Sequence, residues 1–245
     1  MKILLYDIET APLLSYTWGL YETNVIKVVK DWNMLSFAYK WYGGKKTHVK
    51  ALPDYKNYKK DMSDDSALVK DLWDLFNEAD IIIGHNSDRF DIRKTNARFI
   101  KHGLLPPPPH KTIDTLKLAR KYFKFDSNHL TDIGKFLDIG EKVQTGGFAL
   151  WEGCMAGDKK SWKTMIKYNR QDVVLLEKIY EKMRPWMHNH PAVLDRARID
   201  DNDPHCLVCG SDKVQRRGWG RTTANKYQRY QCECGKWGMG KLVRI

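Results

Sequence analysis

Apolar positions along the first 187 residues follow two different periods, one typical of strands and the other of helices. Short runs with few or no charged residues predict strands. Gly43 and Gly44 separate two of these runs and predict a hairpin between them. The predicted strands cover residues 2–8, 33–42, 47–52 and 79–84.

Longer segments carry apolar residues three or four positions apart, which predicts helices with one buried face. In one of them Leu68, Leu72 and Leu75 follow this spacing. The predicted helices cover residues 64–78, 88–102, 113–123, 129–138 and 161–187. A hairpin followed by alternating helices and strands predicts an α/β fold, a mixed sheet flanked by helices.

A polar segment, 188–204, interrupts this pattern. It contains two prolines and has no apolar period, which is typical of a linker. The residues after it contain four of the five cysteines of the chain. We therefore expect a first domain over residues 1–187, a linker over 188–204 and a small second domain over 205–245.

The charge balance indicates a class of binding partner. The chain has 42 Lys and Arg against 30 Asp and Glu, a formal charge of +12, which favours nucleic acid. No apolar run approaches the roughly 20 residues of a membrane span, and Ile3–Tyr6 is too short for a signal peptide. We expect a cytoplasmic protein without a membrane partner; the sequence identifies no protein partner.

Carboxylates occur where the predicted strands end. Asp7 and Glu9 lie two positions apart and so share one face of a strand, while Ile8 points into the core. Asp91 lies early in the helix after the strand 79–84; Asp88 is an alternative to it, and either would also serve as a helix cap. Such carboxylates suit Mg²⁺ or Mn²⁺, and two such ions are the usual means of cutting phosphodiesters.

A tyrosine and a further carboxylate share one face of the last predicted helix. Tyr168 and Asp172 are four residues apart, so they are neighbours on its surface. A tyrosine with a pKa near its usual value of about 10 is a poor general base at neutral pH. We expect Asp172 to bind metal and Tyr168 to orient an attacking water.

Together these motifs resemble the DEDD superfamily of 3′–5′ exonucleases, in the branch that carries a tyrosine (DEDDy). The segment DIET matches the first motif, HNSDRFD the second and YNRQD the third. The resemblance covers about residues 1–187. Its details are closest to the YprB-like exonucleases, in IDTLKLARK, SNHLTDIGKFLDIGEK and QDVVLLEKIYEKMRPW.

The resemblance implies a ribonuclease H-like fold and two divalent ions, Mg²⁺ or Mn²⁺. It implies hydrolysis that releases 5′-nucleotides from a 3′ end. Contacts with the substrate are expected from Thr10, Asn86 and Phe90. The implied catalytic and metal-binding residues are Asp7, Glu9, Asp91 and Asp172, with Tyr168 as a catalytic residue.

Several neighbours of these motifs keep two interpretations. Asp114 resembles a supporting residue at the edge of such a site and would equally serve as a helix N-cap. Asn86 and His85 would touch the terminal nucleotide or only brace the strand end. Phe90 or Tyr16 would stack on the terminal base, a role open to any aromatic ring.

Four cysteines form two close pairs with 22 residues between them. In a reducing compartment this pattern favours metal over disulfides and predicts a zinc ribbon with one structural Zn²⁺. The second pair is one residue shorter than usual, so His205 is an alternative to Cys232 as a ligand. We interpret the lone Cys154 as a packed thiol. The predicted zinc ligands are Cys206, Cys209, Cys232 and Cys234.

The cysteine region is also the most basic part of the chain. From residue 205 to 245 nine Lys and Arg stand against two Asp and Glu, and aromatic residues are interleaved with them. Basic groups with aromatics suit single strands, by phosphate contact and stacking. The segment resembles ribbons of transposases and other DNA-handling proteins. The candidate contacts are Arg217, Trp219, Arg221 and Tyr230.

The sequence therefore favours a metal-dependent 3′–5′ exonuclease for nucleic acid, DNA more than RNA, acting on single-stranded 3′ ends. Two alternatives stay open. One is a structure-specific endonuclease on the same fold, which would cut a circular strand. The other is a nucleic-acid-binding module without catalysis, against which the complete set of carboxylates argues.

Overall fold

The computed structural model describes residues 1–140, 145–193 and 204–244, and the chain divides into two compact units, Met1–Ile179 and Tyr180–Ile245. The division falls within helix α6 (Lys159–Met183). Residues 194–203, most of the predicted linker, lie outside the described part of the chain.

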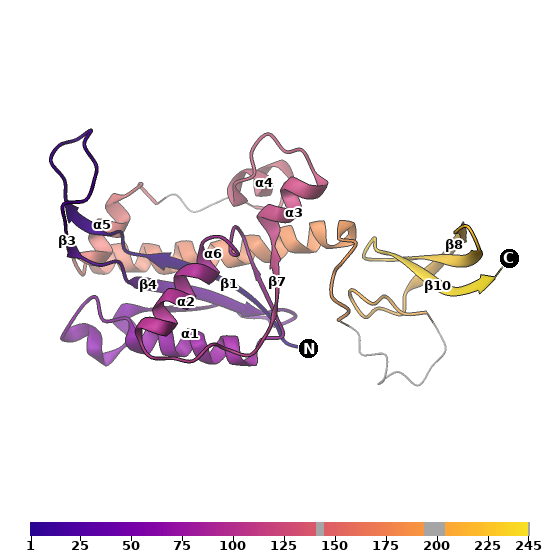
Figure 1. Ribbon diagram of the computed structural model, residues 1–245, viewed down its shortest axis with the longest axis horizontal. Coiled ribbons are helices and arrows are strands. Elements are labelled where there is room, and N and C mark those ends of the chain that lie inside the picture. The colour runs from indigo at the N-terminus through magenta and orange to yellow at the C-terminus, as the bar shows by residue number, and fades with distance from the viewer. Residues whose placement is uncertain (141–144, 194–203, 245) are drawn as a thin grey trace. The chain divides into compact units, whose positions relative to one another are not determined.

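A five-stranded mixed sheet is the centre of the first unit, in the order β5-β4-β1-β6-β7 (Figure 1). Strand β1 pairs antiparallel with β4 and parallel with β6, so it is buried between two neighbours. Its interior position explains its run of apolar residues before the first carboxylate. The strands are β1 Ile3–Thr10, β4 Met34–Trp41, β5 His48–Ala51, β6 Ile81–Gly84 and β7 Lys111–Asp114.

Helices flank this sheet, which confirms the predicted α/β fold with a mixed sheet. On one face Tyr6 of β1 packs edge-on against Phe76, with ring centroids 5.2 Å apart, and Phe76 packs in the same way on Phe99 at 5.5 Å. On the other face Asn169 of α6 contacts β1. Besides α6, the helices of this unit are α1 Ser66–Glu78, α2 Asp91–Lys101, α3 Thr115–Tyr122, α4 Leu130–Phe136 and α5 Ala149–Met155.

The predicted helix over 113–123 is partly wrong, because its first residues form strand β7. Ile113 pairs with Ile83 and Asp114 with Gly84 in a parallel ladder, and α3 begins only at Thr115. A four-residue strand is too short to show a period of its own, so the neighbouring helix pattern obscured it. Helix α5 is also short, and the sequence pattern did not predict it.

A second two-stranded sheet, β2 (Leu14–Tyr16) with β3 (Lys27–Lys30), was not predicted either. The two strands and the loop between them form a hairpin, which we call the β2–β3 arm. It joins the end of β1 to the start of β4, and Ala11 N donates a hydrogen bond to Asn33 O at its base (2.9 Å). The arm thus extends the central ladder beyond the sheet (Figure 1).

A buried ionic cluster ties three elements together. Asp65, just before α1, accepts hydrogen bonds from the Met34 amide of β4 (2.7 Å) and from Arg98 of α2. Its Oδ1 also lies 2.7 Å from His102 Nε2. Asp65 is fully buried and Arg98 is 3% exposed, so neither side chain has water to replace its partner.

The second unit contains a three-stranded antiparallel sheet, β10-β9-β8. Its strands are β8 Val214–Arg221, β9 Asn225–Cys232 and β10 Trp237–Arg244. Around this sheet the buried apolar group consists of Cys206, Val208 and Cys232, which is too small a core to fold the segment alone. Among the helices in the described part of the chain, none combines the length and apolar character needed to cross a membrane.

Candidate active site

The first two carboxylates lie at the carboxyl end of β1. Ile8 between them is 3% exposed and points into the core, while Asp7 and Glu9 face the opposite side and are partly exposed. The alternation of a strand places them together, as predicted. The strand is held on both sides, so the two carboxylates have a fixed spacing.

Helix α6 brings Asp172 to the same place. One carboxylate oxygen from each of Asp7, Glu9 and Asp172 lies within 4.8 Å of the others. Two oxygens bound to one Mg²⁺ at about 2.1 Å lie at most about 4.2 Å apart. A small side-chain movement is therefore enough for these three residues to hold a divalent cation.

Asp91 reaches β1 from the helix that follows β6, the strand next to β1 on the side opposite β4. It is the first residue of α2, and its Oδ1 accepts a hydrogen bond from the Ile8 amide (3.2 Å). Asp91 is thus joined to the backbone between Asp7 and Glu9, although it is outside the group of three oxygens. Burial raises the pKa of Asp91 to about 7, and the charge of Asp114 adds to this effect.

Tyr168 lies beside Asp172 on α6 and is hydrogen-bonded to it. Burial, and then the charges of Asp172, Glu9 and Asp7, raise the pKa of Tyr168 well above its usual value. The phenol consequently keeps its proton at neutral pH and acts as a donor. Trp151 of α5 packs edge-on against its ring at 6.1 Å, so the unpredicted helix positions the predicted tyrosine.

Asn169 is a further residue of the site, and its role was not predicted from the sequence. Its Nδ2 donates to Asp7 Oδ2 (2.7 Å), and its Oδ1 accepts from Ser36 Oγ (3.1 Å) on β4. Asn169 and Ser36 are fully buried, so this chain of hydrogen bonds fixes the Asp7 carboxylate. The signal was present, since an amide among the apolar residues Met165 and Val173 on one helix face needs a polar partner.

Contacts around the turn after β6 decide between the interpretations left open for Asp114, His85 and Asp88. Asp114 is the N-cap of α3 and accepts from the amides of Leu116 (2.9 Å) and Asn86 (2.8 Å). His85 is held by Thr115 Oγ1 (2.9 Å) and Asn128 O (3.0 Å), which is a structural role. Asp88 forms an ion pair with Lys117 (2.6 Å) rather than approaching β1.

The candidate substrate contacts of the first unit are close in sequence to the carboxylates. Asn86 has a positive φ of 59°, which is less costly for Asn than for most residues, and so turns the chain sharply after β6. Phe90 precedes α2 and is 42% exposed. Thr10 follows a register shift in the pairing of β1 with β4.

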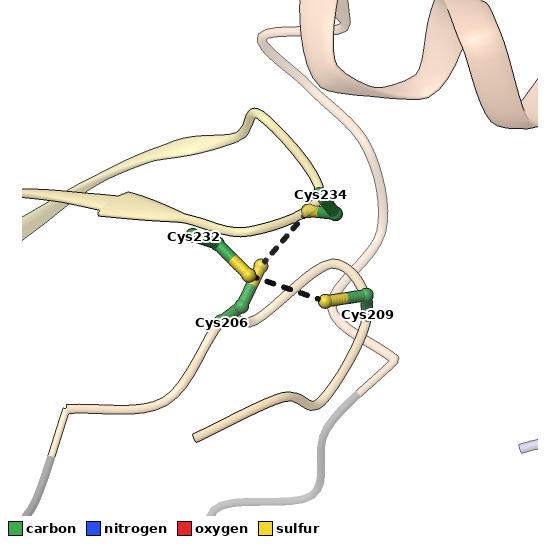
Figure 2. Close-up of side chains that lie close together, drawn as sticks. All are labelled: Cys206, Cys209, Cys232 and Cys234. Carbon is green, nitrogen blue, oxygen red and sulfur yellow. Dashed lines mark hydrogen bonds between the residues drawn. The ribbon is translucent and has the colours of Figure 1, made fainter. Parts of the chain in front are cut away.

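The four predicted cysteines meet in the second unit (Figure 2). The sulfur atoms of Cys206 and Cys234 are 3.8 Å apart, and those of Cys209 and Cys232 are 3.5 Å apart. A tetrahedron with Zn–S bonds of about 2.3 Å has edges of about 3.8 Å. The geometry of this cluster therefore fits Zn²⁺.

The backbone around the cysteines has the form that thiolate ligands need. Gly210 and Gly235 have positive φ values of 81° and 90°, and each closes a turn back to the first cysteine of its pair. The amides of Val208 and Cys209 donate to the Cys206 sulfur. His205 is not part of the metal-binding group found in the described residues.

Cys154 differs from these four thiols. It is fully buried in the core cluster that also contains Tyr168, and burial raises its pKa to about 12. A thiol with so high a pKa is a poor nucleophile, so the structure supports the interpretation of a packed side chain.

The candidate contacts of the second unit lie on its sheet. Arg217, Trp219 and Arg221 are exposed on β8, and Lys226 Nζ lies 5.4 Å from the Trp219 ring centroid. Tyr230 is partly buried and lies over Gly240, where a Cβ would come within 2.9 Å of its ring. Three of the four are therefore open to a ligand, while Tyr230 also packs the sheet.

Comparisons with known proteins agree with this fold. The family model described as the RNase H superfamily matches residues 22–184, a range that includes Asp91 and Asp172 but begins after β1. Among solved structures 146 chains match. One is the family B DNA polymerase from the hyperthermophilic archaeon Pyrobaculum calidifontis, with a TM-score of 0.56 and 17% sequence identity.

That match covers 76% of this chain but 25% of the polymerase, so the chain spans a quarter of that protein's length. At this identity the likeness shows the fold alone. No curated protein matches the chain.

Proposed function

The chain belongs to the RNase H superfamily, and from this and its acidic site we propose that it is a metal-dependent 3′–5′ exonuclease of the DEDDy, YprB-like type. Its substrate is nucleic acid with a single-stranded 3′ end, DNA more than RNA. The observation that carries the proposal is the meeting of Asp7, Glu9 and Asp172 within 4.8 Å, with Asp91 bonded to the same strand.

The carboxylates are the metal ligands in this proposal. Asp7, Glu9, Asp91 and Asp172 hold two divalent ions, Mg²⁺ or Mn²⁺. When bound, such ions activate a water for attack and stabilise the charge that develops on the leaving 3′ oxygen. Burial of Asp91 favours its neutral form, so a cation beside it has the further effect of keeping it charged.

Tyr168 positions the attacking water in this proposal. Its raised pKa excludes the role of a general base at neutral pH and leaves a hydroxyl that donates a hydrogen bond. The hydroxyl is hydrogen-bonded to Asp172, so it lies beside one of the proposed metal ligands, where it would orient a water for attack. Thr10, Asn86 and Phe90 then contact the last nucleotides.

The second unit is a zinc ribbon that aids binding. Sulfur separations of 3.5 and 3.8 Å support one structural Zn²⁺ on the four cysteines, which would provide the folding energy that the small core lacks. Such thiolates fit a reducing cytoplasm. Zinc analysis of the purified protein should find one ion per chain; a chain that folds without zinc would contradict this part.

The proposal is tested by digestion of end-labelled single strands of DNA and RNA with Mg²⁺ or Mn²⁺, beside a circular single strand. A ladder that shortens from the 3′ end, with circles intact, is expected. Cut circles would establish the endonuclease instead. Binding without any cutting would establish the non-catalytic module.

Matched variants identify the site. Asp7→Asn and Asp172→Asn should abolish cutting and keep binding, because each loses a charged ligand and little volume. Asp88→Asn is the control, since Asp88 pairs with Lys117 outside the cluster. Cutting at the rate of the unmodified protein in either of the first two variants would contradict the assignment of the site.

A further inference from the structure

The β2–β3 arm carries large apolar side chains that the core of the protein does not cover. Trp18, Leu20 and Tyr21 at its tip are 80%, 90% and 97% exposed, and Tyr16 on β2 is 62% exposed. Contiguous apolar surface of this kind marks an interaction site on a globular protein. The other exposed large apolar residues of the arm are Leu14, Val25, Ile26, Val28 and Val29.

One face of the arm combines aromatic and cationic groups. In the register of β2 with β3, Tyr16 lies opposite Lys27 and Leu14 opposite Lys30. Side chains directly opposite one another in an antiparallel pair share a face. Both lysines are exposed, and Glu22 is the only acidic residue between positions 12 and 30. The face therefore carries two exposed lysines on β3 and the exposed ring of Tyr16 on β2.

The arm begins where the acidic site ends. Glu9 is the last carboxylate on β1, and β2 begins five residues later, at Leu14. Tyr16 lies seven positions after Glu9, a distance of at most about 25 Å even when the chain is fully extended. A strand whose 3′ end lies at the carboxylates is therefore within reach of the arm a few nucleotides upstream.

We propose that the β2–β3 arm is a binding surface for single-stranded nucleic acid upstream of the 3′ end that is hydrolysed. Tyr16, Trp18 and Tyr21 stack on unpaired bases. Lys27 and Lys30 contact the phosphates. This inference rests on the proposed function and extends it, since it assigns the same substrate a second place of contact.

Charge favours this occupant over a second copy of the chain. Two arms that pack face to face would bring Lys27 and Lys30 of each copy together, within molecules that each carry a formal charge of +12. A nucleic-acid strand brings phosphates to the same lysines and flat rings to the same aromatics.

The decisive variant is Trp18→Ala with Tyr21→Ala, compared with Ile100→Ala with Leu105→Ala. The control residues are 78% and 75% exposed in the same unit and lie outside the arm. Binding of a labelled single strand is measured with the full chain, in an Asp7→Asn background that prevents cutting. Each stacking ring that is removed should weaken affinity by about five-fold or more, so this double variant should bind about 25-fold or more weakly. The control should bind as before.

Three further measurements separate stacking from other causes. Replacement of Trp18 and Tyr21 by Phe should restore binding, because the rings remain. Lys27→Gln with Lys30→Gln should lower the slope of log affinity against log salt by about 1.4, since each phosphate contact on a single strand contributes about 0.7. With Asp7 intact, the arm variants should hydrolyse the p-nitrophenyl ester of thymidine 5′-phosphate at the unmodified rate, since one nucleotide does not reach the arm.

The outcomes distinguish this inference from the function beneath it. Digestion of strands by the unmodified protein, with unchanged binding by the arm variants, overturns the inference and leaves the exonuclease in place. Failure to cut any substrate overturns the exonuclease; weakened binding by the arm variants would then still support the arm as a nucleic-acid surface. If light scattering shows a dimer that the arm variants convert to monomer, the arm is instead an interface between copies.

Discussion

At the scale of single residues, the acidic site depends on uncharged neighbours that hold its charges in place. Asp7 is fixed by Asn169, and Asn169 in turn by Ser36, while the Ile8 amide holds Asp91. A carboxylate that is held by a buried hydrogen bond needs little reorganisation when a cation arrives. The side chains around the ligands therefore matter as much for metal affinity as the ligands do.

Replacing Asn169 by Ala should raise the Mn²⁺ concentration required for half-maximal activity by about 10- to 100-fold, the usual effect of losing a group that orients a ligand. The measurement is a titration of activity with Mn²⁺ at saturating substrate. Arg170→Ala, an exposed neighbour on α6, is the control and should leave the titration unchanged. If Asn169→Ala has the Mn²⁺ dependence of the unmodified protein, the positioning role is wrong.

At the scale of elements, α1, α2 and β4 are joined through one buried acid. Asp65 accepts hydrogen bonds from the Met34 amide of β4 and from Arg98 of α2, and it lies beside His102 at the end of α2. It therefore holds together elements that are distant in sequence. Asp91 begins the same helix α2. The cluster thus helps to determine how the helix that carries the proposed ligand Asp91 sits on the sheet.

Asp65→Ala should lower the free energy of unfolding by about 3–5 kcal/mol, because it leaves the Arg98 charge buried without its partner. Denaturant titration measures the loss. Asp74→Ala is the matched control, since Asp74 pairs with Lys70 on the surface of α1 and its removal should cost at most about 1 kcal/mol. Equal losses in the two variants would show that the Asp65 cluster has no special structural importance.

At the scale of the whole molecule, the formal charge is unevenly distributed. Nine Lys and Arg against two acidic residues lie in the last 41 residues, while the acidic site lies in the first unit. This separation of charge suits the proposed function, in which the first unit hydrolyses and the second holds a polyanion. The β2–β3 arm adds a contact on the hydrolysing unit itself.

Arg217→Gln with Arg221→Gln should weaken single-strand binding and lower its salt slope by about 1.4, at about 0.7 per phosphate contact. Both side chains are exposed on β8. The control is Lys56→Gln with Lys59→Gln, which removes the same charge from a short 3-10 helix of the first unit. A salt slope equal to that of the unmodified protein would reduce the ribbon to a stabilising element.

Much of this architecture follows from local sequence pattern. The spacing of apolar residues predicts the core strands and the long helices. The spacing of Asp7 from Glu9, and of Tyr168 from Asp172, places each pair on one face of its element. The spacing of the cysteines along the chain likewise indicates their grouping into two pairs. Strand β7 and helix α5 are too short for a period to emerge, so sequence pattern alone could not establish them.

The sequence by itself determined the fold class, the acidic motifs and the cysteine cluster, because these depend on residues a few positions apart in strands and helices of known repeat. Only the tertiary structure decided which distant groups meet. Asn169 on α6 reaches Asp7 on β1, Asp91 on α2 accepts a hydrogen bond from the Ile8 amide, and the aromatic residues after β1 stand exposed on an arm. Such contacts join residues far apart in the chain or depend on burial, and no local period records either.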